Sequence, residues 1–308
     1  MKNYKDVKAQ ISAFETICEK LEVDLQTTNS DKEYREIEST LEQTKKNIAE
    51  LETMLSTSIH VSITDTCRSF SPCEFDIPIK LGSVNYMVGS NGSGKTTILQ
   101  KIRSDMDSLY DINKNDRDGM TSVNLDIIKC EPIEVSGVTD KFTHIFALDS
   151  IEDDPSNFIN SSTAYGLVAG GGLEVQHRSK GEKSKIMLSM LITKIQKVLG
   201  FTIDDYKKGG EIEDCRPLIL IDEIDEGMDF KSMLTYDRLL SNLCNIFNAT
   251  VICVTHNPLV CFGNSKYDQC PVFDIKQMKQ ITISDYITNE TGMRLQMVMP
   301  PSEDKQDI

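Results

Sequence analysis

The chain has 308 residues, of which 39% are hydrophobic, and its formal net charge is −15 at pH 7. This length and apolar fraction are enough for one large or two small folded domains, so the composition excludes a disordered chain. The acidic balance argues against indiscriminate binding to phosphate backbones, although a local basic patch on an acidic protein can still hold nucleic acid.

Cysteine usage and hydropathy bear on the cellular compartment. The nine cysteines are odd in number and form no C-x-x-C pair, so we predict reduced thiols that mostly lie in the core. Charged residues such as Lys2, Lys5 and Asp6 interrupt the first twenty positions, which excludes a signal peptide there. The best uninterrupted apolar run, Pro217 to Ile221, is too short to span a bilayer. We therefore expect a cytoplasmic protein.

Residues 4–56 have a helical pattern and contain neither proline nor glycine. Their apolar residues follow coiled-coil spacing in two separate registers, which implies two helices. The first register is Val7, Ile11, Phe14, Cys18, Leu21 and Leu25, and the second is Tyr34, Ile37, Leu41, Thr44, Ile48, Leu51 and Leu55.

The segment Thr27 to Ser30 interrupts this pattern. Ser30 and Glu33 form an S-x-x-E sequence, which predicts a capping box at the start of the second helix. The simplest interpretation of residues 1–57 is an antiparallel hairpin, and one long dimerising helix is the alternative. In either case the apolar stripe must pack, on its own head domain or on a protein partner.

From Ser58 onward the pattern predicts an α/β head domain, residues 58–290, followed by a polar tail, residues 291–308. Alternating or continuous apolar runs predict strands near 59–63, 75–79, 84–88, 125–133, 143–148, 218–221 and 250–254. Helices are predicted at 95–109, 180–199 and 231–248, and short strands within 271–288. Continuous apolar runs are typical of buried parallel strands, so we expect a mixed β-sheet flanked by helices.

A complete G-x-x-x-x-G-K-[ST] motif follows the strand 84–88 and precedes a helix. It consists of Gly89, Ser90, Asn91, Gly92, Ser93, Gly94, Lys95 and Thr96, with Thr97 next. In such a loop, backbone amides surround the β-phosphate, the lysine neutralises the β and γ oxygens, and the hydroxyl after it binds Mg²⁺. The sequence therefore predicts binding of a nucleoside triphosphate with Mg²⁺.

Two acids end the apolar strand 217–221. This places Asp222 at the carboxyl end of the strand as a metal ligand, and Glu223 beside it can polarise the attacking water. The alternative is that these two acids have no catalytic role and simply begin an ordinary loop.

Further motifs make the chain resemble the ABC ATPase superfamily over residues 58–290. The resemblance is to the soluble branch with RecF, the structural-maintenance-of-chromosomes proteins and small ATPases of DNA repair or phage defence. Ser179-Lys180-Gly181-Glu182 resembles the S-G-G-Q/E signature that precedes a helix. The resemblance implies ATP and Mg²⁺ as ligands. It also implies a homodimer in which Ser179, Gly181 and Glu182 reach the nucleotide of the opposite subunit.

Two more segments carry this resemblance. Residues 226–229 resemble the loop after the catalytic acid, and Thr255-His256-Asn257-Pro258 follows the strand 250–254. A lone histidine after a strand is usually unremarkable, but the resemblance implies that His256 contacts the γ-phosphate and acts with Glu223.

Several positions depart from the family pattern. Lys180 replaces the first signature glycine, and Asp149-Ser150 stand where the family has a glutamine that contacts metal and water. No aromatic residue can be assigned to adenine stacking, because Phe70 and Phe75 are better explained as core residues. Glycines 170–172 are interpreted as a flexible connection, and His177 as a loop residue.

These patterns predict a soluble ATPase that closes as a dimer on Mg-ATP and drives a complex of the DNA-repair or phage-defence type. The alternative is an ATP-gated scaffold whose hairpin recruits a nuclease or toxin, with slow hydrolysis as a timer. A transporter subunit is disfavoured, and the short distance from Lys95 to Ser179 disfavours a chromosome-bridging protein. The rate of ATP hydrolysis by a Glu223 variant distinguishes the soluble ATPase from the ATP-gated scaffold.

Overall fold

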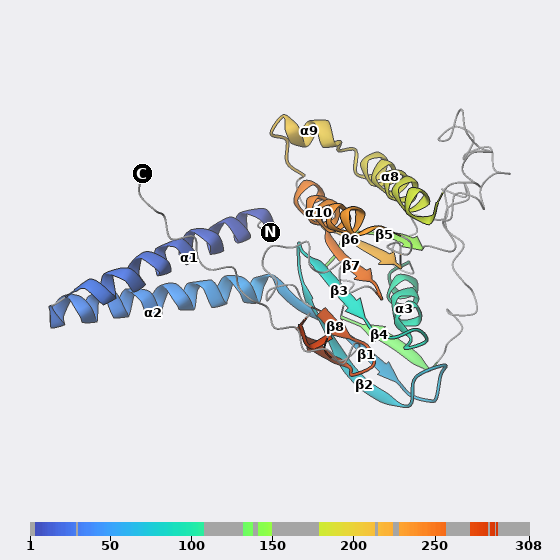
Figure 1. The fold of residues 1–308 in the computed structure, drawn as a ribbon, viewed down its shortest axis with the longest axis horizontal. Helices are drawn as coiled ribbons and strands as arrows, with labels where there is room; N and C mark the ends of the chain where they lie inside the picture. Colours follow the sequence, from blue (N-terminus) through green and yellow to red (C-terminus); the bar gives the residue numbers. More distant parts are fainter. Residues whose placement is uncertain are drawn as a thin grey trace.

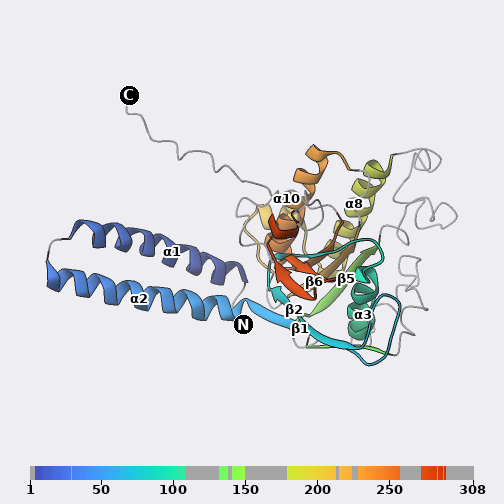
Figure 2. The same ribbon diagram turned by 60° about the horizontal axis from the view of Figure 1, so that its bottom comes forward.

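The computed structural model describes residues 4–28, 30–107, 132–137, 141–149, 179–212, 215–223, 228–256, 272–282, 284–286 and 288. Within these ranges, two long helices project from one side of an α/β head (Figures 1 and 2). No helix in the described ranges has both the length and the apolar character needed to cross a bilayer.

The projecting helices are α1, Tyr4–Thr27, and α2, Asp31–Met54. They run antiparallel and side by side, which confirms the predicted hairpin and excludes one continuous helix. Val7, Cys18, Leu41 and Thr44 are the buried members of the two predicted registers inside the helices. Many of the outer side chains are charged, and Lys45 of α2 forms a 2.8 Å ion pair with Glu22 of α1.

The predicted capping box at Ser30 and Glu33 is wrong. Ser30 occupies the N-cap position of α2 with extended dihedrals, but its side chain makes no capping hydrogen bond. The Glu33 carboxylate instead accepts a hydrogen bond from the Thr28 hydroxyl at 3.1 Å. The loop threonine thus competes for the acid that the capping box requires.

Three antiparallel strands form a small sheet with the order β2-β1-β4. They are β1, Ser56–Ile63; β2, Cys73–Lys80; and β4, Ile133–Ser136. The strand predicted at 125–133 lies outside the described residues except at its end, where β4 begins. Within the described residues these strands pair only among themselves, so this part of the head forms two sheets where the sequence predicted one.

The larger sheet has six strands in the order β5-β6-β7-β3-β8-β9. Its strands are β3, Val84–Val88; β5, His144–Asp149; β6, Pro217–Asp222; β7, Thr250–Val254; β8, Val272–Asp274; and β9, Lys279–Ile281. All neighbours are parallel except β8 and β9. This is the mixed, helix-flanked sheet that the continuous apolar runs predict.

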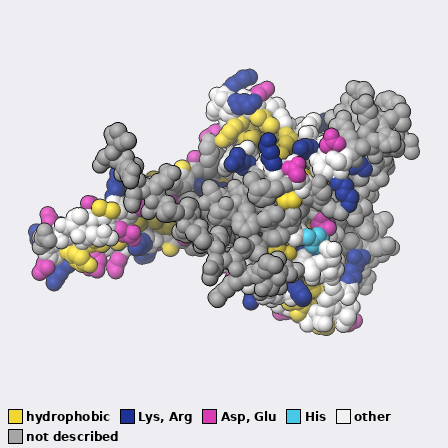
Figure 3. Space-filling view, viewed as in Figure 1, with side chains coloured by type: hydrophobic (Ala, Val, Ile, Leu, Met, Phe, Trp, Pro, Cys, Tyr) yellow, Lys and Arg dark blue, Asp and Glu magenta, His cyan; other side chains and the backbone are white. Residues whose placement is uncertain are grey.

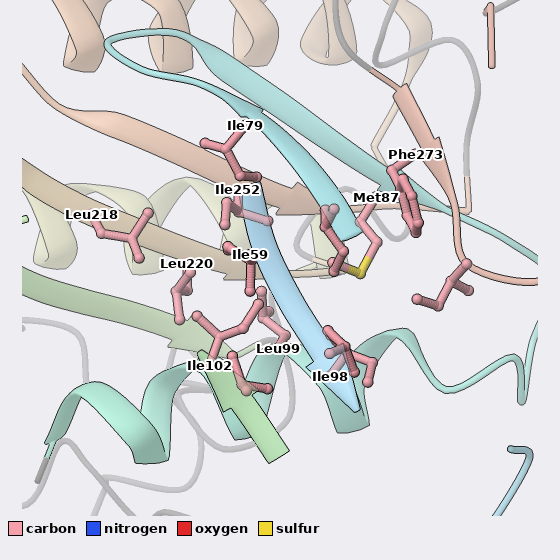
Figure 4. Packing of buried hydrophobic residues seen from close by; sticks show 14 of the residues in the cluster. Ile59, Ile79, Met87, Ile98, Leu99, Ile102, Leu218, Leu220, Ile252 and Phe273 are labelled. Carbon is pink, nitrogen blue, oxygen red and sulfur yellow. The ribbon is translucent and has the colours of Figure 1, made fainter. Parts of the chain in front are cut away.

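The described helices of the head include α3, Lys95–Asp107; α8, Lys180–Leu199; α9, Ile203–Lys207; and α10, Phe230–Phe247. Alternate residues of the central strands enter two different cores. On β6, Ile219 and Ile221 pack with α8 and α10, whereas Leu218 and Leu220 pack with α3 and the small sheet. Figure 4 shows this second core, in which Ile98, Leu99 and Ile102 of α3 pack with residues of both sheets.

Six cysteines fall in the described residues, and all six are free thiols. Five of them are buried, which agrees with the prediction of reduced core cysteines. Cytoplasmic localisation stays a prediction from the sequence.

Candidate functional site

Three neighbouring parallel strands, β6, β7 and β3, end at the same edge of the large sheet. The register pairs Val254 with both Asp222 and Met87, so the three carboxyl ends lie level. The residues that follow these strands therefore meet at one edge, which is where ligands bind in parallel α/β sheets. They include Gly89, Glu223 and His256.

Lys95 is the first residue of α3 and closes the loop Gly89–Thr96, called the P-loop below. Its side chain is 3% exposed, and its ammonium group donates to the carbonyls of Gly89 at 2.9 Å and Ser90 at 3.2 Å. The lysine thus folds back over its own loop.

Gly94 is required by close packing at the end of the P-loop. Its φ of +96° lies in the left-handed region, and a β-carbon there would lie 2.2 Å from Cζ of Phe70. Phe70 is 3% exposed, and Phe75 is buried and stacks on Phe273 at 5.9 Å between ring centroids. Both are core residues, as predicted.

His256 joins Lys95 to Glu223. Its Nε2 lies 2.6 Å from Oε1 of Glu223, and its Nδ1 lies 3.0 Å from the Lys95 ammonium nitrogen. Nδ1 also lies 3.0 Å from the Gly89 carbonyl oxygen, so the ring contacts the P-loop backbone as well as the two charged side chains. The imidazole therefore connects the cation, the loop and the carboxylate, with Lys95 and Glu223 themselves 3.7 Å apart.

Glu223 has a strained backbone. Its φ is +49°, a left-handed conformation that costs a non-glycine residue about 1–2 kcal/mol. The Glu223 N–H donates to the Val254 carbonyl at 3.1 Å, which holds the residue against β7. Such strain is typical of functional positions, and here it turns the carboxylate toward His256.

Thr96 and Asp222 are the predicted metal ligands. Asp222 is the last residue of β6 and is 5% exposed, while Thr96 lies on the first turn of α3 and lines the pocket described next. A hydroxyl and a carboxylate are oxygen donors of the kind that Mg²⁺ accepts when phosphates and waters complete its shell. The described residues contain no larger group of acids, histidines or cysteines suited to a metal ion.

A pocket of about 460 Å³ opens over the P-loop. It is lined by Arg68, Ser69, Gly92, Gly94, Lys95, Thr96, Thr97 and Glu223. Sequence analysis missed Arg68 and Ser69, which lie in the β1–β2 loop. A larger hollow of about 790 Å³ lies against α2 and contains none of the predicted site residues.

A tight turn holds the β1–β2 loop over the pocket. Cys67 and Phe70 exchange two backbone hydrogen bonds of 3.1 and 2.9 Å, and Arg68 between them has a φ of +54°. Because the Phe70 ring packs on Gly94, this turn is fixed to the P-loop. The only sequence feature that pointed to Arg68 and Ser69 was a cationic side chain beside a hydroxyl in the loop that precedes the P-loop motif.

Ser179 is the N-cap of α8. It forms a full capping box with Glu182: its hydroxyl accepts from the Glu182 N–H, and the carboxylate accepts from the Ser179 N–H at 3.0 Å. The same residues that resemble a nucleotide-contacting signature are thus also a helix start. Gly181 lies in the first turn of α8, and Ser179 and Glu182 are exposed, so a second molecule can reach them.

Several sequence predictions fall outside the described residues. These are Ser150, the glycines 170–172, His177, Glu226, Gly227, Asn257 and Pro258. The backbone of Asp149 is described and pairs with Asp222 in the sheet register, so this acid lies level with the predicted metal ligand. Asp229 is the N-cap of α10, where a hydrogen bond from the Ser232 N–H lowers its pKa.

No family model matches the chain, and no curated protein matches it. Solved structures that align with it include cbiO1 of Clostridium perfringens, part of the ABC transporter complex cbiONQ. That alignment has 14% identity, covers 77% of this chain and 91% of that one, and has a TM-score of 0.40. UvrA2 of Deinococcus radiodurans aligns at 13% identity over 71% and 35% of the two chains, with a TM-score of 0.38.

A bacterial Atm1-family ABC exporter with ATP bound also aligns, at 14% identity over 82% and 47% of the two chains, with a TM-score of 0.38. At these identities and scores the alignments do not assign the chain to a family.

Proposed function

We propose that this chain binds Mg-ATP at the P-loop and hydrolyses it between two copies of its head. One observation carries the proposal: Lys95, Glu223 and His256 form a connected network at the edge where three parallel strands end. A motif that matched the sequence by chance would not bring a distant acid and histidine to its lysine.

Nucleotide binding is proposed to rearrange this network. Lys95 now donates to two carbonyls of its own loop, and its ammonium nitrogen lies 3.0 Å from Nδ1 of His256. Phosphate oxygens are stronger acceptors than carbonyls, so the ammonium would turn to them and release His256. His256 could then donate to the γ-phosphate, and Glu223 would be freed to accept a proton from water.

Mg²⁺ would be held by the Thr96 hydroxyl and the Asp222 carboxylate, and when bound it neutralises charge on the phosphate oxygens. Asp149, level with Asp222 in the sheet, is proposed as a further contact on this side. Arg68 and Ser69 are proposed to contact the nucleotide as well, since both residues line the pocket.

The second copy is proposed to complete the site with Ser179, Gly181 and Glu182. This is supported by the exposure of the capping box, whose serine has a hydroxyl directed at a helix N-terminus. The broader proposal is that this hydrolysis drives a complex of the DNA-repair or phage-defence type.

Mixing two inactive variants tests whether the site is shared. Lys95→Ala should lose ATP binding, and Ser179→Asp should keep its helix cap while placing a negative charge beside the partner's γ-phosphate. Each variant alone should be inactive. A mixture should regain ATPase activity, because a mixed dimer has one site with an intact Lys95 and an intact Ser179. Steady-state phosphate release measures this.

Ser179→Asn is the matched control, because asparagine caps helices as well as aspartate without adding charge. It should lose much less activity than Ser179→Asp. If Ser179→Asp retains full activity, or if the mixture stays inactive, the shared site is wrong.

A second candidate function is a scaffold that uses the hairpin to recruit an effector. In the described residues, the large hydrophobic side chains that are exposed, Ile17, Val23, Tyr34 and Met54, all lie on the hairpin. Figure 3 shows hydrophobic and charged side chains mixed along its visible face. Exposed apolar side chains on a projecting arm favour a protein contact there.

A further inference from the structure

The base of the hairpin is attached to the head at two separate places. α2 passes into β1 through Leu55, which is 1% exposed and accepts a hydrogen bond from the Leu81 N–H at 2.6 Å. The first turns of α1 make the other attachment, where Tyr4 and Val7 are buried. A single attachment would leave a hinge at Leu55, whereas two attachments fix the direction of the hairpin.

Asn248 is central to the α1 attachment. It caps α10 in a left-handed conformation, with a φ of +52°. Its side-chain oxygen accepts from the Tyr4 N–H at 3.1 Å, and its side-chain nitrogen donates to the Cys215 carbonyl at 3.0 Å. Both bonds are buried. One amide therefore joins α1 to the end of α10 and to the segment that enters β6.

Gly82, in the turn between β2 and β3, makes the neighbouring contact. Its φ is +65°, and a β-carbon there would lie 2.7 Å from Cβ of Tyr4. Its carbonyl accepts a hydrogen bond from the Lys8 ammonium, and its N–H donates to the hydroxyl of Thr250 at 2.8 Å. Thr250 is the first residue of β7 and is fully buried. The turn thus joins α1 to the start of β7.

These contacts lie at the amino ends of β3, β6 and β7, the strands whose carboxyl ends lead to Gly89, Glu223 and His256. Figure 1 shows the arrowheads of these strands pointing away from the hairpin. Strands of five or six residues are about 17–20 Å long, and close packing makes them move together. The hairpin and the pocket are therefore at opposite ends of the same three strands.

We propose that Tyr4, Lys8, Gly82, Asn248 and Thr250, called the hairpin joint, lock the hairpin and the nucleotide-binding strands into one rigid body. When two heads close, the joint then sets the angle between two hairpins. The first statement concerns the chain alone, and the second rests on the dimer proposed above.

Hydrogen exchange on the full chain without nucleotide tests the joint alone. Gly82→Ala should drive a methyl group into Tyr4 and release the first turns of α1. Amides of peptides covering residues 4–27 should then exchange about tenfold faster or more, as expected when a local contact opens. Gly200→Ala is the matched control, because Gly200 has a similar φ of +61° but open space around it.

Asn248→Gly is a second variant, which tests the joint independently if the Gly82→Ala protein does not fold. Glycine suits the left-handed cap, so only the bonds to Tyr4 and Cys215 are lost. It should also speed exchange in α1 while leaving α10 protected. If neither variant exchanges faster in α1 than the Gly200→Ala protein, the joint does not hold the hairpin.

The effect of the hairpin joint on the angle between two hairpins is measured in the closed dimer. A spin label on a non-natural residue at position 39 of α2, in a Glu223→Gln background with Mg-ATP, reports the distance between two hairpins. A narrow distance distribution that broadens with Gly82→Ala supports the proposal, and an equally broad one with the joint intact overturns it. Absence of a dimer would instead refute the proposed function, while the exchange experiment still decides the joint.

Discussion

Lys95→Ala is expected to abolish ATP binding at physiological concentrations. The Lys95 ammonium is the buried cation of the P-loop, and its present partners are loop carbonyls that phosphate oxygens would replace. Losing charge-assisted hydrogen bonds of about 1.5–3 kcal/mol each should weaken ATP at least about a hundredfold. Titration with a fluorescent ATP analogue, monitored by anisotropy, measures the dissociation constant.

Lys101→Ala is the matched control for this variant. Lys101 lies on the same helix, is only partly buried and does not line the pocket. It should bind the analogue within about twofold of the unmodified chain, as is usual for surface substitutions. Equal affinity of the Lys95→Ala protein and the unmodified protein would exclude the P-loop as the ATP site.

Glu223→Gln is expected to keep ATP binding and lose hydrolysis. The amide preserves the shape of the side chain but cannot accept a proton from water. A positioned general base contributes about 10²–10⁴-fold, so turnover should fall by at least about a hundredfold. Phosphate release and analogue binding should be measured on the same preparation.

Unchanged turnover in the Glu223→Gln protein would contradict the role of this carboxylate. ATP binding without any dependence of turnover on Glu223 would favour the scaffold, in which the pocket acts as a switch and the hairpin recruits a partner.

Local patterns predicted most of the secondary structure. The interruption at Thr27–Ser30 correctly separated two helices, and the apolar runs at 217–221 and 250–254 became the central strands β6 and β7. These features depend on residues close together in the sequence. The partition into two sheets was not predictable, because the pairing of β1 with β4 joins residues about seventy positions apart.

Two of the S-x-x-E sequences in the chain show why local patterns can fail. At Ser179 and Glu182 the full capping box forms, whereas at Ser30 and Glu33 a nearby threonine takes the acid. The resemblance implies a nucleotide contact for Ser179, and the structure shows that the same residue caps α8. Neighbouring donors therefore decide which of two identical patterns forms a cap.

The candidate site was predictable where a motif names the residue type, as for Lys95, Asp222 and Glu223. His256 was placed by its order after β7, and it contacts both Lys95 and Glu223. Arg68 could not be predicted, since it reaches the pocket only because the Phe70 ring packs on Gly94. Such long-range packing leaves no periodic signal in the sequence.

The most direct test of the central claim is the mass of the Glu223→Gln protein in solution, measured by light scattering with and without Mg-ATP. Blocking hydrolysis should trap the closed dimer, so the mass should rise from the 34.6 kDa of one chain to about twice that value only when Mg-ATP is present. A mass that is the same with and without Mg-ATP, in a protein that binds the nucleotide, would contradict closure of two heads on ATP.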